Sequence, residues 1–150
     1  MTLNFKKFAA EGDKFLKYFS KELSYPEDRN RTARVLRSLL HTLRDMITPE
    51  ENVEMLAQLP MFMKAVYVEG WTLKSAQPAR IRTMDQFIKA VRMKAGRTAN
   101  TDFESDDQVE TAMSVLFMTL RRYVSLGEME DIKAVLPKQL KPMLDQVLMF

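Results

Sequence analysis

Apolar side chains recur along this chain three and four positions apart, which is the spacing of one face of an α-helix. The first stripe alternates with lysines and predicts an amphipathic helix over about residues 3–23. Its members are Phe5, Phe8, Phe15, Phe19 and Leu23. We expect this helix to end before Pro26, because proline disfavours a helical residue on its N-terminal side.

A second stripe predicts a helix over about residues 29–46, with Asp28 as its N-cap. Its members are Leu36, Leu39, Leu40, Leu43 and Ile47.

The next signal is Thr48-Pro49-Glu50-Glu51, which has the pattern of a capping box with proline at the first helical position. It predicts a third helix that Pro60 interrupts. A fourth segment over about residues 60–70 follows, and Gly70 stops it.

The second half of the chain repeats this order at an offset of 77 residues. Between residues 39 and 64, nine of 26 positions are identical to positions 116–141 without a gap. The pairs are Leu39/Leu116, Thr42/Thr119, Leu43/Leu120, Arg44/Arg121, Glu51/Glu128, Ala57/Ala134, Leu59/Leu136, Pro60/Pro137 and Lys64/Lys141. We therefore predict an all-α bundle of two tandem related helical units, 1–70 and 83–150, of about three to four helical segments each.

Two connecting regions are expected in this scheme. Residues 71–82 form the linker between the units. An insertion of about five residues near 96–104 has the composition of a loop. We expect the last stretch, residues 142–150, to pack on the core, because its apolar residues would otherwise form an exposed patch.

Composition excludes several kinds of site. The chain has 150 residues, no cysteine, four scattered glycines and a single histidine, His41. It therefore has no disulfide framework, thiolate zinc site, poly-His metal site or glycine-rich phosphate loop. We expect no cofactor.

The net charge is only +3, but basic residues gather on one flank of the second predicted helix. They are Arg29, Arg31, Arg34, Arg37 and Arg44. Arginine pairs well with phosphate, so an anion-binding face for nucleic acid or another polyanion is one interpretation, with the basic residues of 74–97 as a second contributor. The alternative, which we favour, is a solvated face or one that pairs with the chain's own acidic stretches.

Acidic pairs recur with the repeat: Glu51 and Glu54 correspond to Glu128 and Asp131. Two carboxylates three positions apart share one helix face, and two such pairs have the donors for a metal or an acid–base site. We favour a plain role in helix capping, since the acids lie in first turns after Thr48 and Ser125 and lack the Glu-x-x-His of di-iron bundles. No metal or catalytic residue is therefore expected.

Three apolar residues are candidates for partner contact. Met61 and Phe62 follow Pro60, where they are expected to be exposed among otherwise buried methionines. Trp71 is expected mainly to clamp the junction between the units.

Five segments of the chain resemble a known family. They are Leu36-Arg-Ser-Leu-Leu-His-Thr-Leu-Arg-Asp-Met-Ile-Thr-Pro-Glu-Glu51, Ala57-Gln-Leu-Pro60, Tyr67-Val-Glu-Gly-Trp71, Met84-Asp-Gln-Phe-Ile-Lys-Ala-Val91 and Gly127-Glu-Met-Glu-Asp-Ile-Lys-Ala-Val-Leu-Pro137. In this order they resemble the bacterial helical proteins catalogued as domain of unknown function 2267. One departure is that Thr72-Leu73 follow Gly70-Trp71, where the family often has a proline. The resemblance implies a small, cytosolic, all-helical protein and carries no established activity.

Three functions follow from these observations. The favoured one is a non-enzymatic module that binds a protein or peptide in a groove between the units, as a monomer or weak homo-oligomer in the cytoplasm. The second is an auxiliary nucleic-acid or polyanion binder that uses the arginine flank. The third is an enzyme with a carboxylate site, which requires the repeated acids to converge in an enclosed pocket.

Overall fold

The computed structural model describes residues 3–25, 28–72 and 80–149, and this part of the chain is helical and contains no strand. The first half contains α1 (Phe5–Glu22), α2 (Arg29–Met46), α3 (Pro49–Gln58) and α4 (Met61–Val68). The second half contains α5 (Met84–Ala95), the 3-10 turn η1 (Gly96–Thr98), α6 (Ala99–Asp102), α7 (Asp106–Leu120), α8 (Leu126–Val135), the 3-10 turn η2 (Lys141–Leu144) and α9 (Asp145–Leu148). The all-α prediction is confirmed for the described residues.

Local capping explains where the first helices begin. Asp28 accepts a hydrogen bond from the backbone N–H of Arg31 at 3.0 Å, and α2 has the bounds that its apolar stripe predicted. Thr48 accepts from the backbone N–H of Glu51 at 3.2 Å, with Pro49 at the first helical position of α3. Gly70 lies beyond α4 with φ of +70°, a conformation that glycine adopts without strain. Pro26 lies outside the described residues.

The region after α5 differs from the prediction. Residues 96–102 were expected to be a loop but form η1 and α6, which close against α2 and α5. A buried side chain, Asp102, holds this segment: its Oδ2 accepts from the Thr98 hydroxyl at 2.8 Å. The turn-forming residues of this segment predicted a loop. Their composition does not reveal the contact of Asp102 with Arg34 of α2, which is 68 residues away in the chain.

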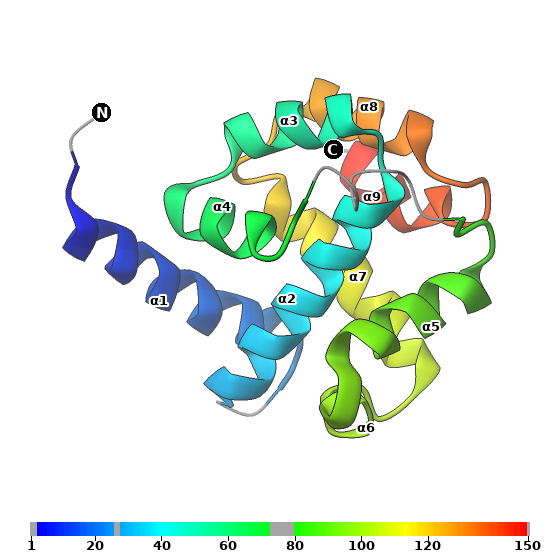
Figure 1. The fold of residues 1–150 in the computed structure, drawn as a ribbon, viewed down its shortest axis with the longest axis horizontal. Coiled ribbons are helices and arrows are strands. Elements are labelled where there is room, and N and C mark those ends of the chain that lie inside the picture. The colour runs from blue at the N-terminus through cyan, green and yellow to red at the C-terminus, as the bar shows by residue number, and fades with distance from the viewer. Residues whose placement is uncertain (1–2, 26–27, 73–79, 150) are drawn as a thin grey trace.

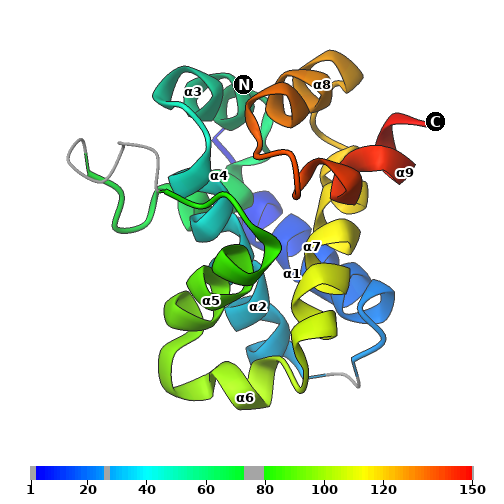
Figure 2. The same cartoon turned by 90° about the vertical axis from the view of Figure 1, so that its right-hand side faces the viewer.

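Helix α2 runs through the middle of the bundle and contacts α1, α4, α5, α6 and α7 (Figures 1 and 2). One continuous core surrounds it. The apolar residues of α2 predicted to face inward are fully or almost fully buried, namely Leu36, Leu39, Leu40, Leu43 and the following Ile47. Large aromatic side chains from the other helices complete the core, namely Phe19, Tyr67, Phe87, Phe103 and Phe117.

Helix α1 has two unlike halves. From Gly12 onward it packs on α4, and Gly12 allows a close approach: a Cβ at this position would lie 3.3 Å from the Cβ of Phe62. Its N-terminal half projects from the bundle (Figure 1), and Leu3 and Phe5 there are 69% and 73% exposed. Of the predicted stripe, Phe15 and Phe19 are buried, Phe8 and Leu23 are half-buried, and Phe5 is exposed.

Helices α3 and α8 lie side by side across one end of the bundle (Figures 1 and 2). The C-terminal segment lies beneath α8 and packs on α7, and Leu144 and Val147 are buried as predicted. No helix in the described part of the chain is long and apolar enough to cross a bilayer.

Candidate functional site

The contact between α3 and α8 brings four acidic side chains together. They are Glu51 and Glu54 of α3 and Glu128 and Asp131 of α8, and one oxygen of each lies within 4.8 Å of the others. Glu54 and Asp131 are exposed, Glu51 is half-buried and Glu128 is buried. The cluster therefore has a closed side and a side that faces solvent.

Capping at the two helix N-termini positions these acids. Ser125 accepts from the backbone N–H of Glu128 at 3.1 Å, as Thr48 does from Glu51. The first-turn location predicted from sequence is confirmed for Glu51 and Glu128, whereas Glu54 and Asp131 lie one turn further along their helices. The carboxylates, however, point toward the neighbouring helix's acids, so a capping role alone does not describe them.

Glu128 is an unusual group in this cluster. Only 5% of it is exposed, and its Oε1 has no hydrogen-bond partner in the described residues. Burial, followed by the interactions with Glu51 and then Glu54, raises the pKa of its carboxyl to about 8. Glu51 Oε2 is likewise buried and unpartnered. A charged carboxylate in such surroundings is costly without a proton or a cation beside it.

The arginines of the predicted basic edge mostly have acidic or carbonyl partners. Arg34 forms an ion pair with buried Asp102 at 2.8 Å, and Arg31 donates to the Asp102 backbone carbonyl at 3.1 and 3.2 Å. Arg29 and Arg37 form exposed pairs with Asp13 and Glu69 at 3.4 and 3.6 Å.

The prediction that Arg44 belongs to an exposed anion-binding face is wrong, because Arg44 is buried. It is 5% exposed and donates to the carbonyls of Tyr67 and Glu69, both at 2.8 Å. These carbonyls lie at the C-terminal end of α4, where the helix leaves acceptors unsatisfied. Arg44 therefore holds α4 against α2, and no local feature of the sequence indicates this long-range role.

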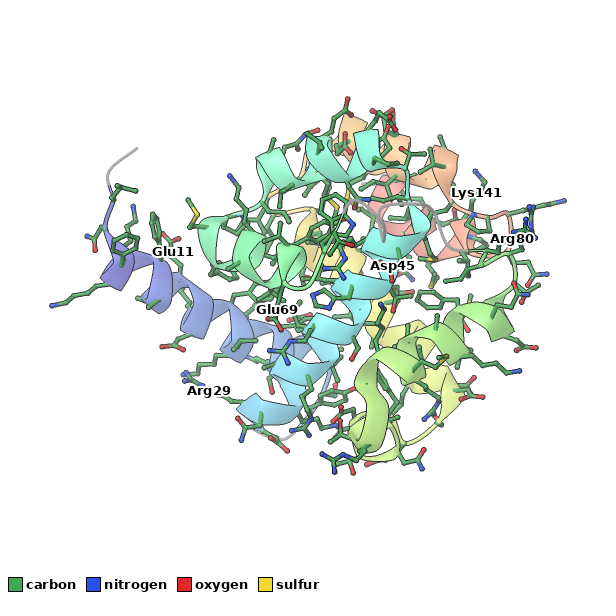
Figure 3. All side chains as sticks on the ribbon, in the orientation of Figure 1. Glu11, Arg29, Asp45, Glu69, Arg80 and Lys141 are labelled. Atoms are coloured by element: carbon green, nitrogen blue, oxygen red, sulfur yellow. The ribbon has the colours of Figure 1, made fainter. Side chains whose placement is uncertain are left out.

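The two basic stretches reach different sides of the molecule, since Arg29 and Arg80 lie at opposite sides of the view in Figure 3. In the second stretch, Lys94 pairs with Asp45 of α2 at 2.7 Å, while Lys74 lies outside the described residues. The observed pairing agrees with the favoured interpretation, in which the bases offset the chain's own acids.

The single histidine, His41, forms a hydrogen bond between two helices of the bundle. His41 Nε2 donates to the Val66 carbonyl at 2.7 Å across the α2–α4 contact. Burial is the main cause that lowers the pKa of His41, and nearby Arg44 lowers it further. The buried Tyr67 hydroxyl of α4 donates to Asn52 of α3, whose amide donates to the Arg44 carbonyl at 2.9 Å.

Two of the three apolar candidates, Met61 and Phe62, are less exposed than predicted. Met61 and Phe62 are half-buried, and the ring of Phe62 packs against Phe15 and Tyr123 with centroids 5.4 and 6.4 Å away. The expectation that Phe62 is exposed is wrong, because α1 covers it at Gly12. Trp71 is half-buried, and its indole N–H has no partner in the described part of the chain.

Two surface hollows lie away from the acids. One, of about 320 Å³, lies between the end of α1 and α7 and includes Tyr25, Arg31 and Gln108. The other, of about 380 Å³, lies between α7 and the C-terminal segment and includes Met118 and Met143. The repeated acids thus converge, as the enzyme hypothesis required, but neither hollow encloses them.

Sequence reasoning missed the burial of Asp102 and the Tyr67–Asn52 pair. It raised the convergence of the acids only as a requirement of the enzyme hypothesis, on the signal that the repeat places acids at equivalent positions of two helices. The geometry of the cluster depends on how α3 and α8 pack.

A search of curated proteins found no match. The model of an uncharacterized conserved protein family, DUF2267, matches residues 12–143, which include every helix from α2 to α8. The chain therefore belongs to the DUF2267 family.

Proposed function

We propose that this protein is a non-enzymatic helical module that binds a protein partner through the projecting half of α1. The observation that carries the proposal is the exposure of Phe5, 73%, on a helix that is otherwise anchored in the core. Leu3, close to it in the chain, is 69% exposed. The rings of Phe5 and Phe8 contact each other edge to face, with their centroids 6.1 Å apart. Aromatic side chains on an unpartnered helix face are typical anchors of protein interfaces.

The charge of this segment suggests the partner's chemistry. Lys6 and Lys7 are exposed beside the aromatic residues, and the first turn of α1 contains no acid. We infer a partner with an apolar surface bordered by acidic residues, because such borders direct encounter and orientation. This location replaces the groove between units expected from sequence.

The test is site-specific photo-crosslinking in cells with a photoreactive amino acid at position 5, and at position 93 as the control. Met93 is also highly exposed, at 81%, but it lies on α5, and its neighbours in the chain are not aromatic. A discrete adduct from position 5 that a Lys6→Glu, Lys7→Glu variant loses supports the proposal. Equal labelling from both positions, or none from position 5, overturns it.

A membrane is the competing target for a basic aromatic helix end. Cosedimentation with vesicles of phosphatidylglycerol distinguishes the two. Vesicle binding that Phe5→Ser abolishes, without a protein adduct in cells, contradicts the protein-partner proposal.

We also infer that the module is built of two related helical units. Three correspondences support this: α3 and α8 span ten residues each at an offset of 77, α2 and α7 begin at the same offset, and equivalent positions are buried. Buried pairs include Leu39/Leu116, Leu43/Leu120, Met55/Ile132 and Leu59/Leu136. An experimental structure in which α2–α3 superposes best on α7–α8 at another offset would contradict the inference.

A further inference from the structure

We propose that the four carboxylates at the α3–α8 contact form a binding site for one hard divalent cation of the size of Ca²⁺. The site consists of Glu51 and Glu54 from one helix and Glu128 and Asp131 from the other. This proposal is independent of the partner-binding function, since α1 contributes no residue to the cluster.

The spacing of the oxygens suits such an ion. Oxygen ligands lie about 2.3–2.6 Å from Ca²⁺, so two ligands on opposite sides of the ion are about 4.6–5.2 Å apart. One oxygen from each of the four acids lies within 4.8 Å of the others. In the smaller shell of Mg²⁺, with ligands at about 2.0–2.1 Å, opposite ligands are only about 4.0–4.2 Å apart, so Ca²⁺ accommodates more of this range.

A second observation points to a missing positive group. Glu128 is 95% removed from solvent, and its Oε1 accepts no hydrogen bond within the described ranges; the same holds for buried Glu51 Oε2. No lysine or arginine of the described residues forms an ion pair with any of the four acids. The other buried acid of the described residues, Asp102, has such a partner in Arg34.

The donor set favours hard ions over transition metals. All four side chains offer carboxylate oxygen, and the chain has no cysteine and only the distant His41. Oxygen donors suit Ca²⁺, Mg²⁺ and Mn²⁺, whereas Zn²⁺ and Cu²⁺ favour nitrogen and sulfur. Exposed Glu54 and Asp131 leave a solvent side where water completes the six to eight ligands of Ca²⁺.

A bound cation would join the two halves of the chain. Each helix contributes two ligands, so the ion bridges α3 and α8 and offsets their like charges. Its expected effect is to stabilise this end of the bundle.

The test is calorimetric titration of CaCl₂ into the full chain after treatment with EDTA and dialysis at pH 7.5, with melting temperature as a second readout. We expect one Ca²⁺ per chain, a melting temperature that rises with CaCl₂, and weaker effects of MgCl₂. Glu128→Gln is expected to lower the Ca²⁺ affinity at least tenfold, about one order of magnitude for each 1.4 kcal/mol lost.

Glu130→Gln is the matched control, because Glu130 is exposed on the same helix but outside the cluster. It is expected to bind Ca²⁺ as the wild type does. If Glu128→Gln does not fold, Asp131→Asn tests the same site from an exposed position. Absence of binding at millimolar CaCl₂, or equal affinity in Glu130→Gln and both site variants, overturns the proposal.

Discussion

Among the described residues, two helix contacts bury a carboxylate, but only one of them supplies hydrogen-bond donors to every buried oxygen. At the α2–α6 contact, Asp102 is fully buried and receives charged and neutral donors, Arg34 at 2.8 Å and the Thr98 hydroxyl at 2.8 Å. At the α3–α8 contact, Glu128 is almost as buried but faces Glu51, and its Oε1 has no donor.

The difference distinguishes a buried charge that stabilises the fold from one that is suited to bind a ligand. A buried acid with hydrogen-bonding partners makes its contact specific, and loss of a partner destabilises the fold. A buried acid among acids opposes folding until a proton or cation neutralises it. Groups of the second kind concentrate at functional sites, so α3–α8 is where we expect ligand-dependent behaviour.

The largest effect is expected from breaking the satisfied pair. Arg34→Ala leaves Asp102 buried without its cation, and we expect a loss of about 2–4 kcal/mol in the free energy of unfolding, measured by urea denaturation. Arg29→Ala is the matched control, because the Arg29–Asp13 pair is exposed; a change below about 0.5 kcal/mol is expected. Equal effects of the two substitutions would contradict the structural role of Asp102.

The unsatisfied acid predicts a pH dependence in the presence of EDTA. The pKa of Glu128 rises from 4.5 to about 8 on folding, so the folded protein holds an extra proton between these values. The free energy of unfolding should therefore fall as pH rises from about 5 to 8, by on the order of 1–3 kcal/mol. Urea denaturation across this range measures it.

Glu128→Gln provides the control for this profile. It removes the titrating group, so the difference between wild type and variant should widen in the variant's favour as pH rises. Parallel profiles for the two proteins contradict the assignment to Glu128.

A smaller effect is expected at the buried hydrogen bond between Tyr67 and Asn52. Tyr67→Phe leaves Asn52 Oδ1 without its donor, as Glu128 Oε1 is without one, but the atom is uncharged. We expect a loss of about 1–2 kcal/mol in thermal or urea unfolding. Val68→Ala, at a 40% exposed position of the same helix, should change stability less; the reverse order would contradict the prediction.

The smallest effect on stability is expected at the projecting end of α1. Phe5→Ser should change the free energy of unfolding by less than about 0.5 kcal/mol, because Phe5 is exposed. Phe19→Ser, at a fully buried position of the same helix, should unfold the protein or cost several-fold more. Chemical denaturation of both variants checks this, and a large loss in Phe5→Ser would show that the α1 end is part of the core.

The sequence predicted the helices well because their signals are local. Apolar spacing and the Asp28 and Thr48 caps lie within a few residues of the elements that they specify. The partners of the polar contacts could not be predicted in this way, because Arg34 and Asp102 are 68 residues apart in the chain. An arginine on a helix surface is equally typical of an anion-binding face. The repeat identified the acids of the α3–α8 cluster, but only the packing of the helices brings their oxygens together.

The most direct test of the contrast between the two acids is the site-resolved titration of the Glu128 carboxyl by carbon-13 NMR in EDTA, with Glu128→Gln to assign the signal. A buried acid without a cationic partner should titrate near pH 8. A midpoint near 4.5, the ordinary value for glutamate, would show that Glu128 is solvated or paired and would contradict the account.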